Sequence, residues 1–188
     1  TLEICRQYTC QVFEFPWVDN FAAARNYSLT QARGDWILVL DADEVIARSD
    51  LQMLRSLLAH TDDDVFLLNQ LNYSNDPTER DWQPVVGDHI FGWAYAGFRV
   101  NPIARLFRNR PDIRYVGKVH EVIDLADERI REATPNVPIH HDINGNPQKD
   151  KNGRQRNYLR IMEDALKQHP DGRLASQAGV VRMYQLQD

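Results

Sequence analysis

Two carboxylates one residue apart follow an apolar run in the first third of the sequence. The run is Trp36–Leu40, and the acidic residues Asp41, Asp43 and Glu44 come directly after it. A continuous apolar run of this length is typical of a strand covered on both faces of an α/β sheet, and such sheets bind ligands at their strand ends. Two carboxylates there can converge on one hard cation, which would also compensate the cost of burying several acids together. The pattern therefore predicts a divalent metal site at Asp41 and Asp43; the alternative is a solvated acidic turn before the next helix.

The elements that would hold this site alternate between helical and strand periodicity. Asn20 can cap a helix that ends at Gly34, and Ser49 with Gln52 has the pattern of a capping box for a second helix. Val65–Leu68 has the pattern of the next buried strand. This alternation predicts parallel βα units, with the acidic pair at the carboxyl end of a central parallel strand.

The second half of the sequence is less regular. Residues 72–101 have weak periodicity and contain Trp82, Trp93 and Tyr95, which indicates a long functional loop or an irregular insertion. Beyond this segment, the sequence predicts short strands and two helices, at Ile103–Phe107, Ile113–Val116, Val137–His140, Arg154–Gln168 and Leu174–Leu186.

Composition places the chain among ordinary globular domains and excludes several function classes. It has 188 residues, of which 43% are hydrophobic and 26% charged, enough for a core without covalent staples. A net charge of −5 argues against a general nucleic-acid binder, whose affinity would come from a basic face. No apolar run approaches the roughly 20 residues that span a bilayer. The two cysteines, Cys5 and Cys10, cannot form a disulfide framework or a four-ligand zinc site, and we expect both to be buried or half-buried.

Four sequence blocks resemble, in order, the central part of a family 2 glycosyltransferase. They are NFAAARN at 20–26, ARGDWILVLDADE at 32–44, RLFRN followed by YVGKVHE between 105 and 121, and IHH at 139–141. This order is similar to that of the bacterial subgroup often joined to helical repeats. The resemblance implies an α/β fold of the GT-A type, related to the Rossmann fold: a mixed sheet flanked by helices, truncated at the N-terminus, with a helical C-terminal tail. We expect a partial glycosyltransferase core at 1–150 and a helical segment at 151–188.

The resemblance implies an inverting, metal-dependent transfer of a sugar from a nucleotide diphosphate sugar to an acceptor hydroxyl or other nucleophile. Asp41 and Asp43 would hold Mn or Mg against the diphosphate of the donor, where the ion stabilises the charge of the leaving group as a Lewis acid. In the family, the arginine of the first block lies near the nucleotide. This makes Arg25 a candidate donor contact, and the alternative is a surface arginine on a helix.

A histidine near the end of the matched region is the third candidate metal ligand. His141 occupies the position where a family histidine commonly completes the metal or diphosphate site, and His140 is its competitor. Neutral imidazole is a common ligand of borderline metals, although a histidine at a strand end can equally be structural. The family usually continues with a Gly-aromatic pair, whereas this sequence continues with DING at 142–145.

An inverting transferase also needs a carboxylate that takes the proton of the acceptor hydroxyl during its attack on the anomeric carbon. Glu121 is the candidate catalytic base. Alternatively, Glu121 orients the donor or pairs with an arginine such as Arg105 or Arg108, and Asp81 or Asp88 serves as the base. The three loop aromatics are candidates for stacking on an acceptor sugar or for anchoring the loop.

The expected partners are a nucleotide diphosphate sugar and an acceptor that is a glycan, a protein or a lipid; nucleic acid is not expected. Family members begin with a nucleobase-binding strand, an acidic residue and a Ser-Thr-Asp turn, and Thr1 stands where the chain would leave that turn. We therefore expect this piece to bind a donor weakly and to self-associate through an exposed sheet edge. The expected location is cytoplasmic, either free or at a membrane surface.

Two other functions compete with this interpretation. The run that ends in Asp41 and Asp43 also matches haloacid-dehalogenase-like phosphatases, in which Asp41 would be the nucleophile and Asp43 the acid/base. That family requires a further Ser or Thr, a Lys and a late acidic pair, which are not found in that order. The other alternative is a degenerate or truncated transferase that acts as a binding module without turnover.

Overall fold

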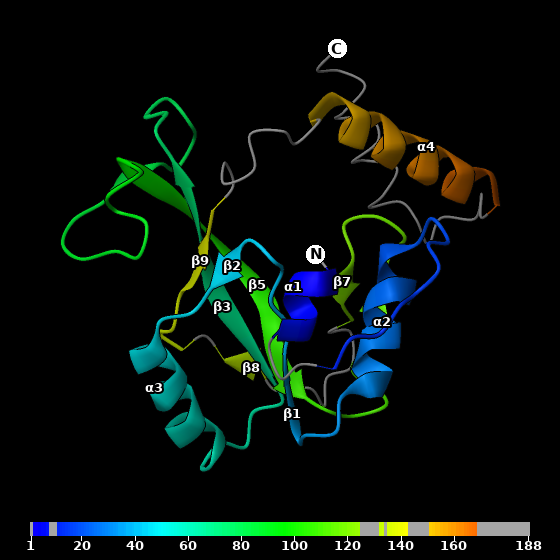
Figure 1. The fold of residues 1–188 in the computed structure, drawn as a ribbon, viewed down its shortest axis with the longest axis horizontal. Helices are drawn as coiled ribbons and strands as arrows, with labels where there is room; N and C mark the ends of the chain where they lie inside the picture. The colour runs from blue at the N-terminus through cyan, green and yellow to red at the C-terminus, as the bar shows by residue number, and fades with distance from the viewer. Residues whose placement is uncertain (1, 8–10, 125–131, 134, 143–150, 169–188) are drawn as a thin grey trace. The chain divides into compact units, whose positions relative to one another are not determined.

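The computed structural model describes residues 2–7, 11–124, 132–133, 135–142 and 151–168 (Figure 1). The chain divides into two compact units. The first unit consists of Thr1–Ala32, Arg114–Asp124 and Asp150–Asp188, and the second consists of Arg33–Ile113 and Leu125–Lys149. No helix among the described residues is both long and apolar enough to span a lipid bilayer.

The second unit is built on a mixed sheet. The main path of the sheet runs in the order β1 (Trp36–Leu38), β5 (Gly97–Arg108), β3 (Val65–Ser74), β9 (Ile139–His141) and β2 (Glu44–Val45). Two short strands join this path, with β4 (Gln83–Pro84) pairing with β5 and β8 (Glu132–Ala133) pairing with β3. The pairs β3–β9 and β3–β8 are parallel, and the other pairs of this sheet are antiparallel. The mixed sheet expected from the sequence is therefore confirmed.

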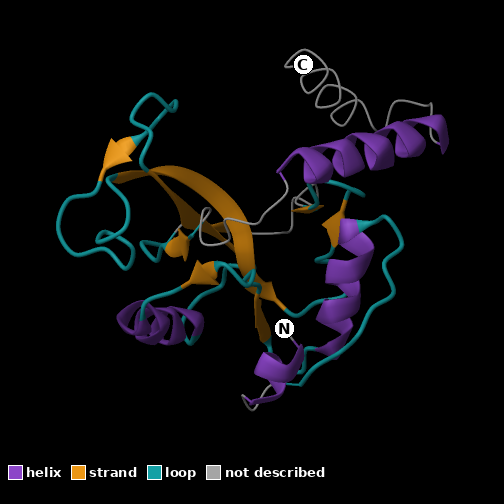
Figure 2. Ribbon diagram, turned by 45° about the horizontal axis from the view of Figure 1, so that its top comes forward, coloured by secondary structure: helices purple, strands orange, loops and turns teal. Residues whose placement is uncertain are grey.

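The structure corrects the expected order of neighbouring strands. β5 is 12 residues long and pairs antiparallel with the whole of β3. Figure 2 shows the long curved strands of this sheet. The far edge of β5 pairs antiparallel with β1, in a register that places Ile37 opposite Phe107. β5 thus separates β1 from β3, so the two predicted buried strands are not neighbours in a parallel βα pair. Among the described residues, β1 stands at one end of the strand order and not at its centre.

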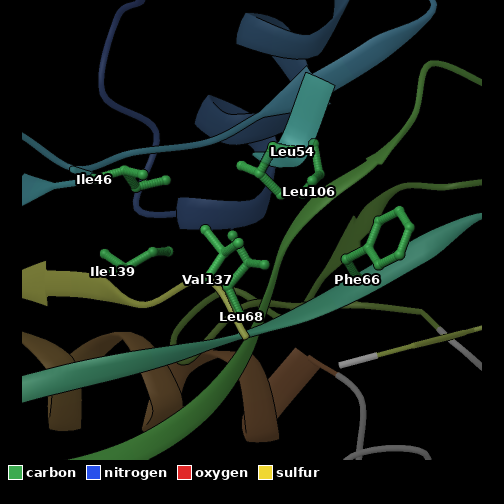
Figure 3. Packing of buried hydrophobic residues seen from close by; sticks show 7 residues of the cluster. All are labelled: Ile46, Leu54, Phe66, Leu68, Leu106, Val137 and Ile139. Atoms are coloured by element: carbon green, nitrogen blue, oxygen red, sulfur yellow. The ribbon is translucent and has the colours of Figure 1, made fainter. Parts of the chain in front are cut away.

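The core of the second unit lies between the sheet and helix α3 (Arg48–Leu58). Figure 3 shows the buried side chains of this cluster, which are Ile46, Leu54, Phe66, Leu68, Leu106, Val137 and Ile139. The helix begins at Arg48 after Ala47, which makes no side-chain cap bond, so the predicted capping box at Ser49 and Gln52 is wrong. Packing of Leu54, only 3% exposed, fixes the helix on the sheet instead.

The first unit contains the helices α1 (Leu2–Gln7), α2 (Phe21–Gln31) and α4 (Lys151–Gln168), together with the hairpin of β6 (Tyr115–Val116) and β7 (Val122–Ile123). The predicted cap at Asn20 is confirmed, because its Oδ1 accepts a hydrogen bond of 3.0 Å from the Ala23 amide. The helix ends three residues before Gly34, the residue predicted to stop it.

Helix α4 packs on the other elements of the first unit through a small apolar cluster. Ile161 and Met162, each 2% exposed, contact Val119, and Phe21 packs against them. The helix predicted at 154–168 is therefore present, with three further residues at its start. The helix predicted at 174–186 and Cys10 lie outside the described residues, and Cys5 is half-buried.

Candidate functional site

The acidic motif forms a tight turn between β1 and β2. β1 ends at Leu38, two residues earlier than predicted, although the Val39 amide still donates to the carbonyl of Arg105 at 2.8 Å. The Glu44 amide then donates to the carbonyl of Asp41 at 3.0 Å, which closes the turn. The motif therefore stands at the carboxyl end of a strand, as predicted, and the strand is paired with β5 on its described side.

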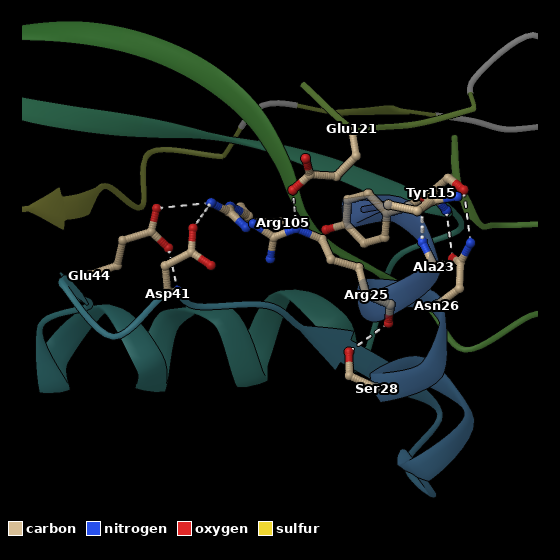
Figure 4. A network of polar contacts seen from close by, with 10 residues as sticks. Ala23, Arg25, Asn26, Ser28, Asp41, Glu44, Arg105, Tyr115 and Glu121 are labelled. Carbon is tan, nitrogen blue, oxygen red and sulfur yellow. Dashed lines mark hydrogen bonds and ion pairs between the residues drawn. The ribbon is translucent and has the colours of Figure 1, made fainter. Parts of the chain in front are cut away.

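An arginine compensates two of the three acids in this turn. Arg105 Nη2 lies 2.7 Å from Asp41 Oδ2 and 3.1 Å from Glu44 Oε1, as Figure 4 shows. The Arg105 side chain is 5% exposed and that of Glu44 is 0% exposed, whereas that of Asp41 is 40% exposed. The three neighbouring acids predicted a metal ion as the compensating charge. For Asp41 and Glu44, a buried guanidinium from β5 supplies compensating positive charge, and a metal ligand at Asp41 stays a prediction.

Asp43 faces a different partner, His141 of β9. The register of β2 and β9 places Glu44 opposite His141, which brings His141 Nε2 to 3.6 Å from Asp43 Oδ2. The Asp142 amide also donates to the Asp43 carbonyl at 3.0 Å. On the other side of the ring, His141 Nδ1 lies 2.8 Å from Asn72 Oδ1. An amide oxygen only accepts, so Nδ1 donates to Asn72, and Nε2 is the ring nitrogen that faces the Asp43 carboxylate.

This donor set fits a divalent ion that is completed by a substrate. A metal-bound histidine usually donates its other N–H to an oxygen, and Asn72 takes that role for His141. The described part of the chain contains no cluster of three or more His, Cys, Asp or Glu residues that could hold an ion without help. Mg²⁺, however, is often held by one or two carboxylates together with substrate phosphates. Asp43 can supply such a carboxylate, and His141 can add an imidazole nitrogen.

His140 points to the other face of β9 and is held by a buried tyrosine. Tyr73 Oη lies 2.7 Å from His140 Nδ1 and 3.1 Å from His89 Nδ1. Burial raises the pKa of Tyr73 to about 12, so its hydroxyl stays protonated near neutral pH and can donate to one ring while it accepts from the other. The structure thus separates the two candidate histidines, because His141 reaches the acidic turn and His140 joins β9 to the loop that carries His89.

This buried position of His140 predicts a dependence of stability on pH. The pKa of His140 is lowered, mainly by burial and secondly by the charge of His89, against an opposing effect of Asp50. As pH falls below about 6.5, the unfolded chain binds this proton before the folded chain does, so folding stability is lost. We expect the free energy of unfolding, measured in urea, to rise from pH 5 to pH 7, and His140→Gln to flatten part of this slope. The exposed His60→Gln variant should keep the slope, and an equal slope in His140→Gln would contradict the assignment.

The two other predicted site residues meet in the first unit. Arg25 of α2 forms an ion pair with Glu121, with Nε and Oε1 2.5 Å apart (Figure 4). Their side chains are 23% and 12% exposed. The guanidinium of Arg25 also lies 5.4 Å from the centre of the Tyr115 ring. Hydrogen bonds of Asn26 to the backbone of Tyr115, both 2.9 Å, fix this helix beside the hairpin.

The arginines considered as partners of Glu121 have other partners. Arg105 holds the acidic turn of the second unit. Arg108 lies 4.5 Å above the Trp36 ring and 3.4 Å from Asp64 Oδ1. Among the alternatives that the sequence left open for Glu121, pairing with an arginine is therefore present, and the arginine is Arg25.

The aromatic residues of the loop between β3 and β5 divide into two groups. Trp82 donates to the Ser74 carbonyl at 3.2 Å and covers Gly97, where an added Cβ would lie 2.1 Å from the indole. Tyr95 donates to Asp142 Oδ1 at 2.5 Å. Both residues therefore anchor the loop, whereas Trp93 is 86% exposed. Asp81 and Asp88, the alternative bases in this loop, are also exposed.

The polar residues that support the site were not predicted from the sequence. Arg105 stands in the apolar run IARLF, and Gln70 and Asn72 alternate with apolar residues in the strand β3. A charged or amide side chain inside such a strand must find a polar partner if it is buried. Such polar residues within apolar strands indicate a buried polar site. Which residue each of them contacts depends on the strand order, which the sequence does not show.

Two comparisons relate the chain to known proteins. Residues 1–118 match the model of the family described as glycosyl transferase family 2, which covers more than half of the chain. A relative from Synechococcus elongatus, described as a TPR repeat-containing protein, is 30% identical over 190 residues, which cover 95% of this chain and 42% of the relative. The chain therefore spans about two fifths of the length of this curated relative.

Proposed function

The chain belongs to glycosyl transferase family 2, and from this premise we propose that it transfers a sugar from a nucleotide diphosphate sugar to an acceptor nucleophile in a metal-dependent, inverting reaction. The observation that carries this proposal is the distance of 3.6 Å between Asp43 Oδ2, in the turn after β1, and His141 Nε2 of β9. The acceptor is a glycan, a protein or a lipid.

In this proposal, Asp43 and His141 would hold Mn²⁺ or Mg²⁺. The bound ion would neutralise the charge that develops on the diphosphate as the sugar leaves. Asn72 keeps the imidazole of His141 in the tautomer whose Nε2 is a ligand. Asp41, which the sequence suggested as a second metal ligand, acts beside the donor with its carboxylate oriented by Arg105.

Arg25 and Glu121 supply the remaining roles in the proposal. Glu121 takes the proton of the acceptor hydroxyl while the hydroxyl oxygen bonds to the anomeric carbon, and the diphosphate leaves with the electron pair of the bond it breaks. Arg25 contacts the anionic donor. Their ion pair supports this assignment only in that it places the two side chains next to each other and holds the carboxylate in one orientation. Trp93, the exposed aromatic of the loop, is the candidate for stacking on an acceptor sugar.

The contact of Arg105 with Asp41 also bears on the competing phosphatase function. In a haloacid-dehalogenase-like enzyme, Asp41 would attack a phosphorus atom. Its Oδ2 instead lies 2.7 Å from a buried guanidinium, which stabilises the carboxylate and weakens it as a nucleophile. This geometry supports donor binding over nucleophilic catalysis at Asp41.

The experiment that tests the proposal uses the full-length protein with UDP- and GDP-sugars. We expect release of the nucleoside diphosphate in the presence of Mn²⁺, loss of this release with EDTA, and recovery when Mn²⁺ is restored. Hydrolysis of a generic phosphate ester would instead support the phosphatase alternative. Donor binding without any release would support a binding module without turnover.

A further inference from the structure

The structure assigns Glu44 and Arg105 as positioning residues that together fix both the backbone and the carboxylate of Asp41. This inference rests on the proposed function of the turn and deepens it. Glu44 makes two of the three contacts in this arrangement. Its Oε2 accepts a hydrogen bond of 2.7 Å from the Asp41 amide, and its Oε1 lies 3.1 Å from Arg105 Nη2. The same nitrogen of Arg105 lies 2.7 Å from Asp41 Oδ2, so the contacts close a ring that returns to Asp41.

The ring is tied to separate strands of the second unit. Glu44 begins β2, Arg105 belongs to β5, and Gln70 of β3 adds a hydrogen bond from its Nε2 to Glu44 Oε1. The Val39 amide also donates to the carbonyl of Arg105, which ties the end of β1 to the same residue. Four strands of one sheet therefore determine where the Asp41 carboxylate points.

Glu44 and Arg105 are too buried to contact a substrate directly. The Glu44 side chain is 0% exposed and that of Arg105 is 5% exposed, so neither presents a surface to a donor. Asp41, at 40% exposed, is the member of the ring that solvent and ligands reach. Glu44 and Arg105 thus act through Asp41.

The ring orients the Asp41 carboxylate more than it contributes to the free energy of folding. A buried ion pair loses much of its attraction to the cost of removing two charges from water, and neutral replacements of similar volume often fold as well. A ring of charge-assisted hydrogen bonds does, however, restrict the rotation of the Asp41 side chain and the path of its backbone. A displacement of about 1 Å at a reacting group can reduce a rate by roughly 10²-fold.

The same strand offers a matched control. Arg108 lies three residues beyond Arg105 in β5, and it contacts Asp64, a second acid whose side chain is 7% exposed. Besides Asp64, the Arg108 guanidinium donates to the carbonyls of Asp63 and Thr61, which lie outside the acidic turn. Removing either arginine alone would leave a buried acid with less compensation, so both charges of each pair are removed together.

The test compares Glu44→Gln/Arg105→Met with Asp64→Asn/Arg108→Met in the full-length protein. In the first variant, we expect turnover of a nucleotide sugar to fall by roughly 10²-fold, with a smaller change in the KM of the donor. Hydrogen exchange of the Asp41 amide, followed by NMR, should become about fivefold faster, because a neutral acceptor replaces a charged one. The control variant should keep the wild-type Asp41 exchange rate and should lose at most about threefold in turnover.

The outcomes separate this inference from the proposed function. If the wild-type protein releases no nucleoside diphosphate from any donor, the proposed function fails, and the exchange rate of the Asp41 amide alone decides whether the ring fixes the turn. If the wild-type protein is active and Glu44→Gln/Arg105→Met retains the turnover of the control, the ring does not position Asp41 for the reaction. An unchanged exchange rate of the Asp41 amide would likewise overturn the inference.

Discussion

Asp43→Asn in the full-length protein is expected to lower the rate of sugar transfer by about 10²- to 10³-fold, which corresponds to the roughly 3 to 4 kcal/mol that one element stabilising a developing negative charge supplies. The amide keeps the shape of the side chain but removes the negative charge that would attract a divalent ion. His141 would remain in place, because its Nδ1 is held by Asn72 at 2.8 Å. The measurement is the initial rate of nucleoside diphosphate release at saturating donor and Mn²⁺.

The Asp43 prediction has a second readout and a control. The affinity for Mn²⁺ in the presence of UDP, measured by electron paramagnetic resonance, should weaken in Asp43→Asn. Asp62→Asn replaces an exposed aspartate outside the acidic turn and should change neither quantity. Full activity of Asp43→Asn would remove Asp43 from the proposed site.

Glu121→Gln is expected to lower turnover by about 10²- to 10⁴-fold, the range for loss of a general base. The amide cannot take the proton of the acceptor hydroxyl, although it can still accept a hydrogen bond from Arg25. The measurement is kcat with a complete donor and acceptor pair. A protein that hydrolyses the donor slowly should lose that activity too, because water must also be deprotonated when it attacks.

A double-mutant cycle separates catalysis from orientation at Glu121. If Glu121 only orients Arg25, then Arg25→Met should cost as much as Glu121→Gln, and the double variant should cost no more than either. If Glu121 is the base, Glu121→Gln should cost more than Arg25→Met, which would act mainly on the KM of the donor. Equal losses in the two single variants would contradict the assignment of Glu121 as the base.

The sequence predicted the acidic turn because local features determine it. The apolar run before Asp41 forms a strand, and the cap at Asn20 forms the helix that carries Arg25. A block resemblance then indicated His141, which pairing of β2 with β9 brings to Asp43. Periodicity and motifs act over a few residues, so they remain visible in the sequence.

The strand order and the charge partners were not predictable in the same way. β5 lies between β1 and β3 because a long antiparallel strand forms from residues more than 55 positions after β1, and no local pattern states which edge it joins. Arg105 reaches the acidic turn as a consequence of that pairing. The three neighbouring acids predicted a metal ion as their compensating charge. The sequence did not show that Arg105, which is distant in sequence, also compensates two of them.

The most direct measurement is a crystal structure of the full-length protein with UDP and Mn²⁺, using anomalous diffraction at the manganese absorption edge. The proposal predicts an anomalous peak bound by Asp43 Oδ2 and His141 Nε2 and by oxygens of the diphosphate, with Asp41 still held by Arg105. UDP bound with its diphosphate away from the acidic turn, or a manganese peak that neither Asp43 nor His141 contacts, would contradict the proposal.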